Sequence, residues 1–352
     1  MVYVEQTAEV ERLYEAFRGL NLAPLWTQTA DLMPRSPRPE ARPYAWRWQA
    51  LLPVAEQAGR LVPVGRGGER RAIALANPGL EGLPFATPTL WAAVQYLGPR
   101  EVAPSHRHSQ TAFRFVLEGE GVWTVVDGDP VAMREGDLLL TPGMAWHEHQ
   151  NAGDNPMVWL DGLDIPLVRM LDAGFFEPGP DQLSNAATPS TCRSERLWGH
   201  PGLLPLTETA VTPSSPLLVY RWPDTDAALR AQLDERAGAP SALEPGHGAV
   251  RVVNPATGKD ALTTIRLEIH RLAAGARTVP SCRVGSSVWQ VLHGGARFEL
   301  DGDVMELERG DLVAVPSWCR FSVAAEHGAD LFTFSDAPFY EAIGLDRSDP
   351  AT

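Results

Sequence analysis

The chain begins with a helical pattern of apolar residues and continues into a segment without regular periodicity. Apolar residues recur at helical spacing through residues 5–18, and Gly19 ends the pattern. Residues 23–63 are rich in proline and tryptophan, and we expect an irregular arm packed on a core, because free linkers lack so many large aromatic residues. Residues 1–85 are therefore predicted to form an N-terminal helical and irregular arm.

From residue 86 onward, short runs of β-forming residues predict strands. The runs are separated by glycines and by Asp127-Gly128, a dipeptide typical of tight hairpins. The predicted strands span residues 90–97, 113–117, 122–126, 137–141 and 157–161. Several short strands at this spacing are typical of a small antiparallel barrel or jelly roll, which we expect over residues 86–176.

Residues 177–261 are predicted to connect this barrel to a second strand region. The first part of the connection is dense in proline, serine and threonine, and a helix is expected over residues 224–236. Strand patterns return after the connection, so residues 262–352 are predicted to form a second barrel and a C-terminal tail.

The second strand region repeats the first. His106 stands 13 residues before Gly119, and Ser281 stands 13 residues before Gly294. A Gly-Asp pair recurs at 136–137 and at 310–311, and in both copies a proline follows at the same distance. The chain therefore contains two copies of one β-barrel unit, and we predict a mainly β fold.

Composition narrows the function classes. With 352 residues, 44% of them apolar, the chain can build two substantial cores. A formal net charge of −14 argues against a nucleic-acid partner, and no apolar run approaches the ~18 residues of a membrane span. Cys192, Cys282 and Cys319 are odd in number and widely spaced, which predicts no disulfide framework or structural zinc site and fits a reducing cytoplasm.

Three histidines in the first repeat form a candidate metal site. His106 and His108 stand two apart in a predicted strand, so both side chains point the same way. His147 follows the Gly-Asp pair of the same repeat. Three imidazoles suit Fe(II) with positions left for substrate and O2, although imidazole also binds zinc, copper and nickel. An isolated H-x-H pair is more often a surface or structural feature.

A second block of the cupin sequence pattern strengthens the metal interpretation. This block joins Gly136, Pro142, His147 and Asn151 at the spacing of the pattern, with Met144 in place of its inner glycine. The first block lacks the glutamate that many cupins place after H-x-H, so a three-histidine site is expected. The positions of the second repeat that match the three histidines are Ser281, Arg283 and Phe321. We therefore expect no metal there and a structural or interfacial role.

Longer stretches resemble the gentisate 1,2-dioxygenase family, which includes salicylate and 1-hydroxy-2-naphthoate dioxygenases. The stretches are A-P-L-W (23–26), W-R-W (46–48), E-R-R-A-I-A-L-A-N-P-G-L (69–80), S-H-R-H-S-Q-T-A-F-R-F-V-L-E-G (105–119) and W-L-D-G-L-D-I-P (159–166). The resemblance implies a bicupin of two antiparallel jelly-roll barrels, commonly a homotetramer. It also implies Fe(II) as cofactor and a reaction with O2 that opens an aromatic ring between the carboxyl-bearing and hydroxyl-bearing carbons.

The same resemblance implies which residues form the site. The metal ligands would be His106, His108 and His147, and the substrate pocket would contain Arg70, Trp91, Gln95, Arg114, His149, Trp159 and Asp161. The two arginines would attract an aromatic carboxylate into an acidic protein, since guanidinium matches carboxylate geometry. His149 would exchange a proton with the substrate hydroxyl, and Asp161 would orient that histidine or a ring hydroxyl.

Several alternatives stay open at the level of sequence. Taken alone, the two tryptophans are more often core residues, Arg66 competes with Arg70, and Asp164 competes with Asp161. Met33, Ala72 and Ala93 are further candidates for shaping the pocket. Gentisate, giving maleylpyruvate, is the preferred substrate. Salicylate or 1-hydroxy-2-naphthoate is the alternative, followed by a non-catalytic ligand-binding cupin and by a zinc isomerase or hydrolase.

Overall fold

The computed structural model describes residues 7–64, 71–180, 183, 189–208, 213–235 and 243–349. By internal contacts the chain divides into two units, Met1–Pro39 and Glu40–Thr352. In the first unit, α1 (Ala8–Gly19) is followed by α2 (Leu25–Leu32), and Trp26 Nε1 donates a hydrogen bond of 3.1 Å to the Tyr14 hydroxyl. The helix expected from the apolar periodicity is confirmed, with a later start.

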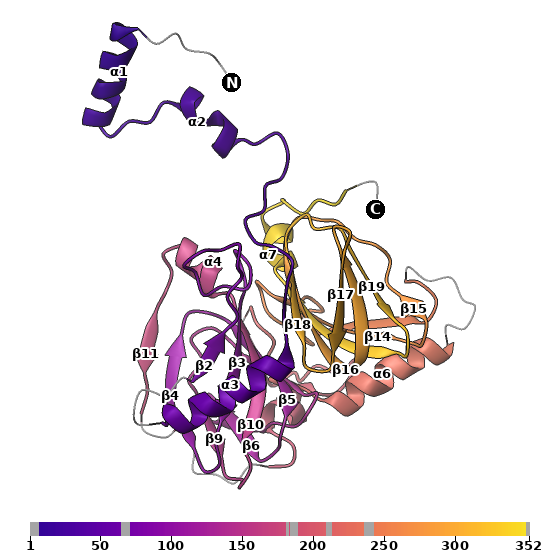
Figure 1. Cartoon of the computed structure of the whole chain (residues 1–352). Coiled ribbons are helices and arrows are strands. Elements are labelled where there is room, and N and C mark those ends of the chain that lie inside the picture. Colours follow the sequence, from indigo (N-terminus) through magenta and orange to yellow (C-terminus); the bar gives the residue numbers. More distant parts are fainter. Residues whose placement is uncertain are drawn as a thin grey trace. The chain divides into compact units, whose positions relative to one another are not determined.

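The first barrel consists of two antiparallel sheets (Figure 1). Its strands are β2 (Ala72–Ala74), β3 (Trp91–Leu97), β4 (Val102–His108), β5 (Ala112–Glu118), β6 (Val122–Val126), β7 (Asp129–Ala132), β8 (Leu138–Thr141), β9 (His147–Asn151), β10 (Met157–Leu163), β11 (Phe176–Pro178) and β12 (Val219–Tyr220). One sheet has the order β12-β8-β5-β10-β3-β2 and the other β11-β4-β9-β6-β7. All five strands expected for this barrel are present, with bounds that differ by a few residues. Two short helices, α4 (Ile165–Met170) and α5 (Arg193–Trp198), follow its last long strand.

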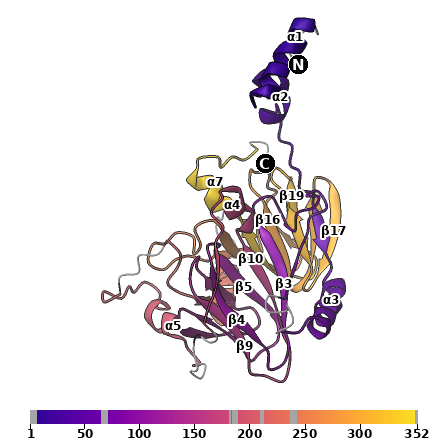
Figure 2. The same cartoon turned by 90° about the vertical axis from the view of Figure 1, so that its left-hand side faces the viewer.

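The second barrel repeats this arrangement, and Figures 1 and 2 show it in orange and yellow beside the first. Its elements are β13 (His247–Arg251), β14 (Arg266–Leu272), β15 (Ala276–Arg277), β16 (Ser287–Leu300), β17 (Asp303–Glu308), β18 (Leu312–Val315), β19 (Phe321–Ala325), β20 (Ala329–Ser335) and α7 (Ala337–Ala342). The long strand β16 pairs with β18 and β20 through its first half and with β17 and β19 through its second. The prediction of a mainly β fold with two antiparallel barrels is confirmed.

One apolar cluster contains residues of both barrels and joins them. On β5, Phe113 and Phe115 alternate with Arg114, so the two rings face the second barrel while the arginine faces the interior of the first. Phe115 stacks on Phe332 with ring centroids 4.1 Å apart, and Phe113 lies edge-on to Phe334 at 4.8 Å. The face of β5 that holds the barrels together therefore also fixes the direction of Arg114.

Two strand–helix units cross between the barrels. In the first unit, β1 (Tyr44–Trp46) pairs with β18 of the second barrel, and α3 (Trp48–Leu61) then packs against β3 of the first. In the second unit, β12 pairs with β8 of the first barrel, and α6 (Trp222–Glu235) packs against β13 and β14 of the second. Regular structure at 44–61 corrects the expectation of an irregular segment there. The helix expected over 224–236 is present and starts earlier.

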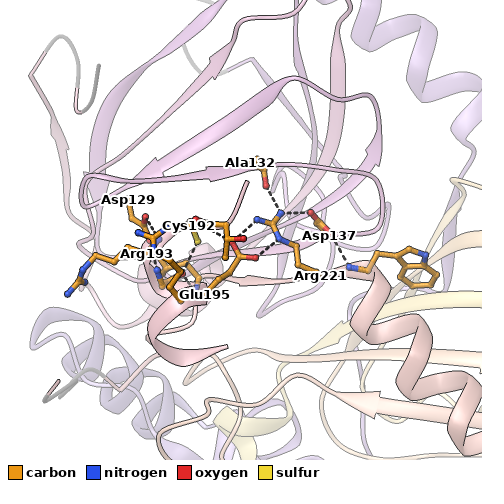
Figure 3. A network of polar contacts seen from close by, with 12 residues as sticks. Asp129, Ala132, Asp137, Cys192, Arg193, Glu195 and Arg221 are labelled. Atoms are coloured by element: carbon orange, nitrogen blue, oxygen red, sulfur yellow. Dashed lines mark hydrogen bonds and ion pairs between the residues drawn. The ribbon is translucent and has the colours of Figure 1, made fainter. Parts of the chain in front are cut away.

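An Arg-Trp pair in each of the two strand–helix units contacts the Gly-Asp pair of one barrel. Figure 3 shows Arg221, whose guanidinium donates to Asp137 at 2.6 Å and makes two hydrogen bonds of 2.8 Å to Glu195, while the Trp222 amide donates to Asp137 at 3.0 Å. In the other copy, Arg47 and the Trp48 amide both donate to Asp311 at 2.8 Å. The repeat therefore extends beyond the barrels into both flanking segments.

Candidate active site

The three candidate ligands meet across two paired strands. His106 and His108 lie on β4, His147 begins β9, and the backbone pairing sets His106 opposite His147. One ring nitrogen from each histidine lies within 4.8 Å of the others. Among the described residues, these three form the one cluster of His, Cys, Asp or Glu side chains that could hold a metal ion.

The hydrogen bonds of the histidines fix which nitrogen faces the centre. Each Nδ1 lies 2.9 Å from a backbone carbonyl oxygen two residues away, and these carbonyls belong to Pro104, Gln110 and Ala145. A carbonyl only accepts, so every Nδ1 carries the proton and every Nε2 keeps its lone pair. Within the described part of the chain, His147 Nε2 is buried without a hydrogen-bond partner. This donor set fits a divalent transition metal.

The turn before His147 explains the departure from the cupin pattern. Met144 has a φ of 65°, in the left-handed region where the pattern has glycine, and its amide donates to the His108 carbonyl at 2.7 Å. Trp318 has a φ of 63° at the matching turn of the second barrel. Both barrels therefore keep the glycine-like turn with a large residue.

A cavity of about 290 Å³ opens beside the histidines, near the lower end of the roughly 300–1,000 Å³ usual for ligand pockets. It is lined by Ala72, Trp91, Gln95, His106, His108, Arg114, His147, His149, Asp161, Leu163 and Ile165. Leu163 shares the strand parity of Asp161 and could have been found from it, whereas Ile165 opens helix α4 and no sequence pattern indicated it. The cavity therefore brings together the three histidines and five of the seven pocket residues that the resemblance implied.

The remaining sequence candidates lie elsewhere. Trp159 is fully buried and supports the cavity from behind: its indole Nε1 donates to Asp161 at 3.1 Å. Ala93 is fully buried and does not line the cavity. Met33 belongs to the Met1–Pro39 unit, and Arg66 and Arg70 lie outside the described residues. Asp164 points away from the cavity toward Thr264.

Arg114 and Asp161 form a buried ion pair in the cavity wall. Arg114 Nε lies 3.4 Å from Asp161 Oδ1, a distance of charge contact but not of a hydrogen bond, and Nη1 donates to the Thr141 hydroxyl. Burial lowers the pKa of Arg114, and the charge of Asp161 opposes that effect. Burial raises the pKa of Asp161 to about 6, although Arg114 and the Trp159 indole both favour its ionised form.

His149 lies deeper in the same cavity. Its Nδ1 is 2.8 Å from the Thr124 hydroxyl, which also lies 3.2 Å from Met133 Sδ. Burial, followed by the positive charge of Arg114, holds the pKa of His149 well below its ordinary value. The imidazole is therefore neutral and keeps a nitrogen able to accept a proton.

The second barrel has the same framework without the donors. Ser281 bridges to Phe321 just as His106 pairs with His147, and Arg283 stands where the first barrel has His108. The cavity beside Arg283 and Phe321 holds only about 10 Å³, the space of one water molecule. Side chains thus fill the place of the metal centre.

Comparisons with known proteins agree with this geometry. Residues 93–163 match the family model described as a cupin domain. Gentisate 1,2-dioxygenase of a Streptomyces species is 62% identical over 98% of this chain and 97% of its own length, and 1-hydroxy-2-naphthoate 1,2-dioxygenase of Nocardioides strain KP7 is 35% identical over 89% and 80%. The crystal structure of salicylate 1,2-dioxygenase from Pseudoaminobacter salicylatoxidans, an adduct with gentisate, superposes with a TM-score of 0.96 at 53% identity, covering 99% of this chain and 95% of that one. None of the helices in the described part of the chain has both the length and the hydropathy that a transmembrane helix requires.

Proposed function

Since the chain belongs to the gentisate 1,2-dioxygenase family and is a ring-cleaving dioxygenase of the bicupin fold, we propose that it converts gentisate to maleylpyruvate with iron held by His106, His108 and His147. One observation carries the proposal: three imidazole Nε2 atoms converge on a cavity that also contains a buried arginine. Imidazoles bind a transition metal, and a guanidinium binds a carboxylate in a two-pronged manner.

Iron is proposed because the three ligands are neutral and leave coordination positions open for substrate and O2. Three imidazoles fill only part of the octahedral positions that Fe(II) prefers. When bound there, Fe(II) supplies Lewis-acid and redox chemistry toward the substrate oxygens and O2. The metal ion is proposed to bind in the first barrel, over residues 86–176. The connection 177–261 and the second barrel 262–352 are proposed to support it, and the arm 1–85 also contributes Ala72 to the cavity wall.

The cavity residues have complementary proposed roles. Arg114 binds the substrate carboxylate, and its pairing with Asp161 sets the direction of the guanidinium. Trp91 provides a flat wall for the ring and Gln95 an amide for a ring oxygen. His149, which is neutral because burial lowers its pKa, accepts or shares the proton of the substrate hydroxyl through the lone pair of its imidazole.

Two further residues complete the proposed site. Arg70 is proposed as a second cation for the carboxylate, on the strength of the family resemblance. Trp159 is proposed to act through its hydrogen bond to Asp161, which fixes the side-chain carboxylate of Asp161 in the cavity wall.

Salicylate is a second candidate substrate, because the salicylate 1,2-dioxygenase structure superposes over nearly the whole chain. Salicylate lacks the second ring hydroxyl of gentisate, so turnover of both would mean that this hydroxyl is not required for ring opening. 1-Hydroxy-2-naphthoate tests whether the cavity admits a fused ring. We further propose a cytoplasmic homotetramer, which fits the three free cysteines and the family resemblance.

The test is oxygen uptake by protein purified without air and analysed for bound metal. Gentisate should drive O2 consumption with formation of a ring-opened product, and iron should be the bound metal. Salicylate and 1-hydroxy-2-naphthoate are compared at equal concentration. Absence of O2 uptake on all three acids by iron-loaded protein would overturn the proposed function, and zinc as the supporting metal would overturn the choice of iron.

A further inference from the structure

We propose that the second barrel is a positioning element of the metal centre, and that it acts through Thr264, which holds the peptide that orients His108. The inference rests on the proposed function in one respect only: that a metal ion binds at the three histidines. It gives the second barrel a role in the chemistry of the first, although its described residues form no cluster that could hold a metal ion.

The connection consists of three hydrogen bonds. Thr264, two residues before β14 of the second barrel, donates its hydroxyl to Asp164 Oδ2 at 2.7 Å. Asp164 Oδ1 accepts the backbone N–H of Thr111 at 3.0 Å. The carbonyl oxygen of Gln110 accepts Nδ1–H of His108 at 2.9 Å.

The last two bonds are made by one rigid group. The Gln110 carbonyl and the Thr111 N–H belong to the same peptide unit. This unit is planar and trans, so the two bonds lie in one plane and point in opposite directions. Fixing the N–H on Asp164 therefore fixes the carbonyl that sets the ring angle of His108. Rotation of this peptide would turn Nε2 of His108 away from the other two histidines.

Asp164 is well suited to hold this peptide. It is 4% exposed, and it immediately follows β10. Burying a carboxylate without hydrogen-bond donors costs free energy, so the orientation of the Asp164 side chain is set by the donors that surround it. In the described residues its side chain accepts from Thr111 and from Thr264, and only the second belongs to the other barrel.

The chain contains its own control for this connection. In the second barrel, Asp336 immediately follows β20 and accepts the Ser286 N–H at 2.8 Å and the hydroxyl of Thr89, which stands two residues before β3 of the first barrel. The peptide held in this way lies next to the position of Arg283, where no metal ligand exists. The hydrogen bond that joins the barrels thus occurs twice, but only the copy at Thr264 ends at a ligand.

The experiment compares Thr264→Val and Thr264→Ser with Thr89→Val in the full-length protein. Metal-free protein is titrated with Co²⁺, and metal affinity, the visible spectrum of the bound ion and the melting temperature are recorded. Thr264→Val should bind Co²⁺ more weakly, by up to about tenfold, and with a changed spectrum. It loosens the outer partner of His108, and losing such a partner outright costs about 10–100-fold in affinity. Thr264→Ser should restore both, and Thr89→Val should lower the melting temperature but leave Co²⁺ binding unchanged.

Each outcome decides the inference. Wild-type affinity and spectrum in Thr264→Val would overturn it, and so would an equal loss of affinity in Thr89→Val, because the effect would then be general destabilisation. If Thr264→Val does not fold, Thr264→Ala provides the same comparison without a branched side chain. Failure of the wild-type protein itself to bind Co²⁺ at the histidines would instead refute the proposed metal site.

Discussion

Arg114 Nε lies 3.4 Å from Oδ1 of Asp161, and both side chains are about 95% buried in the wall of the cavity that contains the three histidines. The pairing follows from sheet register, because β5 and β10 set these two residues directly opposite each other. A buried guanidinium with one carboxylate beside it still has donors to offer, since arginine has five N–H groups. This surplus supports the proposal that Arg114 binds a substrate carboxylate in a chain of net charge −14.

Replacing Arg114 should weaken turnover without removing the metal. Hydrogen bonds to charged groups contribute roughly 1.5–3 kcal/mol, so Arg114→Ala should lower kcat/KM for gentisate about tenfold to hundredfold. Arg114→Lys should recover only part of the loss, because lysine lacks the two-pronged geometry. Steady-state O2 uptake with metal content checked in each variant measures this. Arg100→Ala, at an exposed pair with Asp154, is the control. Unchanged kcat/KM in Arg114→Ala would mean that the carboxylate is held elsewhere.

Metal should bind once per chain. Among the described residues, the one candidate metal-binding cluster lies in the first barrel, so metal analysis of the loaded wild-type protein should give about one ion per chain. His147→Ala should lose the ion and all ring cleavage yet keep its fold, because the second barrel has Phe321 at the matching position and folds with it. Circular dichroism and melting temperature check the fold. A second stoichiometric ion near Arg283, or near-normal activity of metal-loaded His147→Ala, would contradict the assignment.

The contact between Glu195 and Arg221 shown in Figure 3 should make the free energy of unfolding depend on pH in the acid range. Burial alone would raise the pKa of Glu195, but hydrogen bonds from Arg221 and from the Cys192 amide lower it to about 2, below the ordinary 4.5. A depressed pKa stabilises the fold fully above about pH 4.5, and this stabilisation is lost as the pH falls toward about 2. Urea unfolding of wild type and Glu195→Gln should therefore show a difference in unfolding free energy that shrinks across this window. The exposed Glu306→Gln is the control, and a difference independent of pH would refute the linkage.

The turn beneath the Arg221 anchor should accept only glycine. Gly136 has a φ of +79°, and a Cβ there would lie 2.7 Å from the Trp222 side chain. Gly128 has a similar φ of +84° with open space around it. Gly128→Ala should thus cost about 1–2 kcal/mol from the left-handed backbone alone, whereas Gly136→Ala should add about 1–3 kcal/mol for displacing the indole. Chemical denaturation of both variants measures the difference in their unfolding free energies. Equal losses would show that the Trp222 side chain moves aside at no cost.

The sequence by itself determined the repeated barrel and the three histidines proposed as metal ligands. Strand alternation sets His106 and His108 on one face, and the glycine, proline and asparagine spacing around His147 indicates the same turn that the structure contains. The second repeat lacks the histidines, so residue identity alone distinguishes the two barrels. These features are local, since each depends on residues within one strand or one turn.

Contacts between distant segments were decided only by the tertiary structure. Proline-rich residues before the first barrel predict an irregular segment, yet 48–61 form a helix because α3 is held by Asp311 and packs on Tyr96. Trp159 has the strand parity of Asp161 but does not line the cavity; its indole lies behind the carboxylate to which it donates. The bond from Thr264 to Asp164 spans 100 residues. Strand parity fixes which way a side chain leaves its own strand, but which groups then meet depends on how separate strands pair and pack, and no pattern of spacing along the chain encodes that.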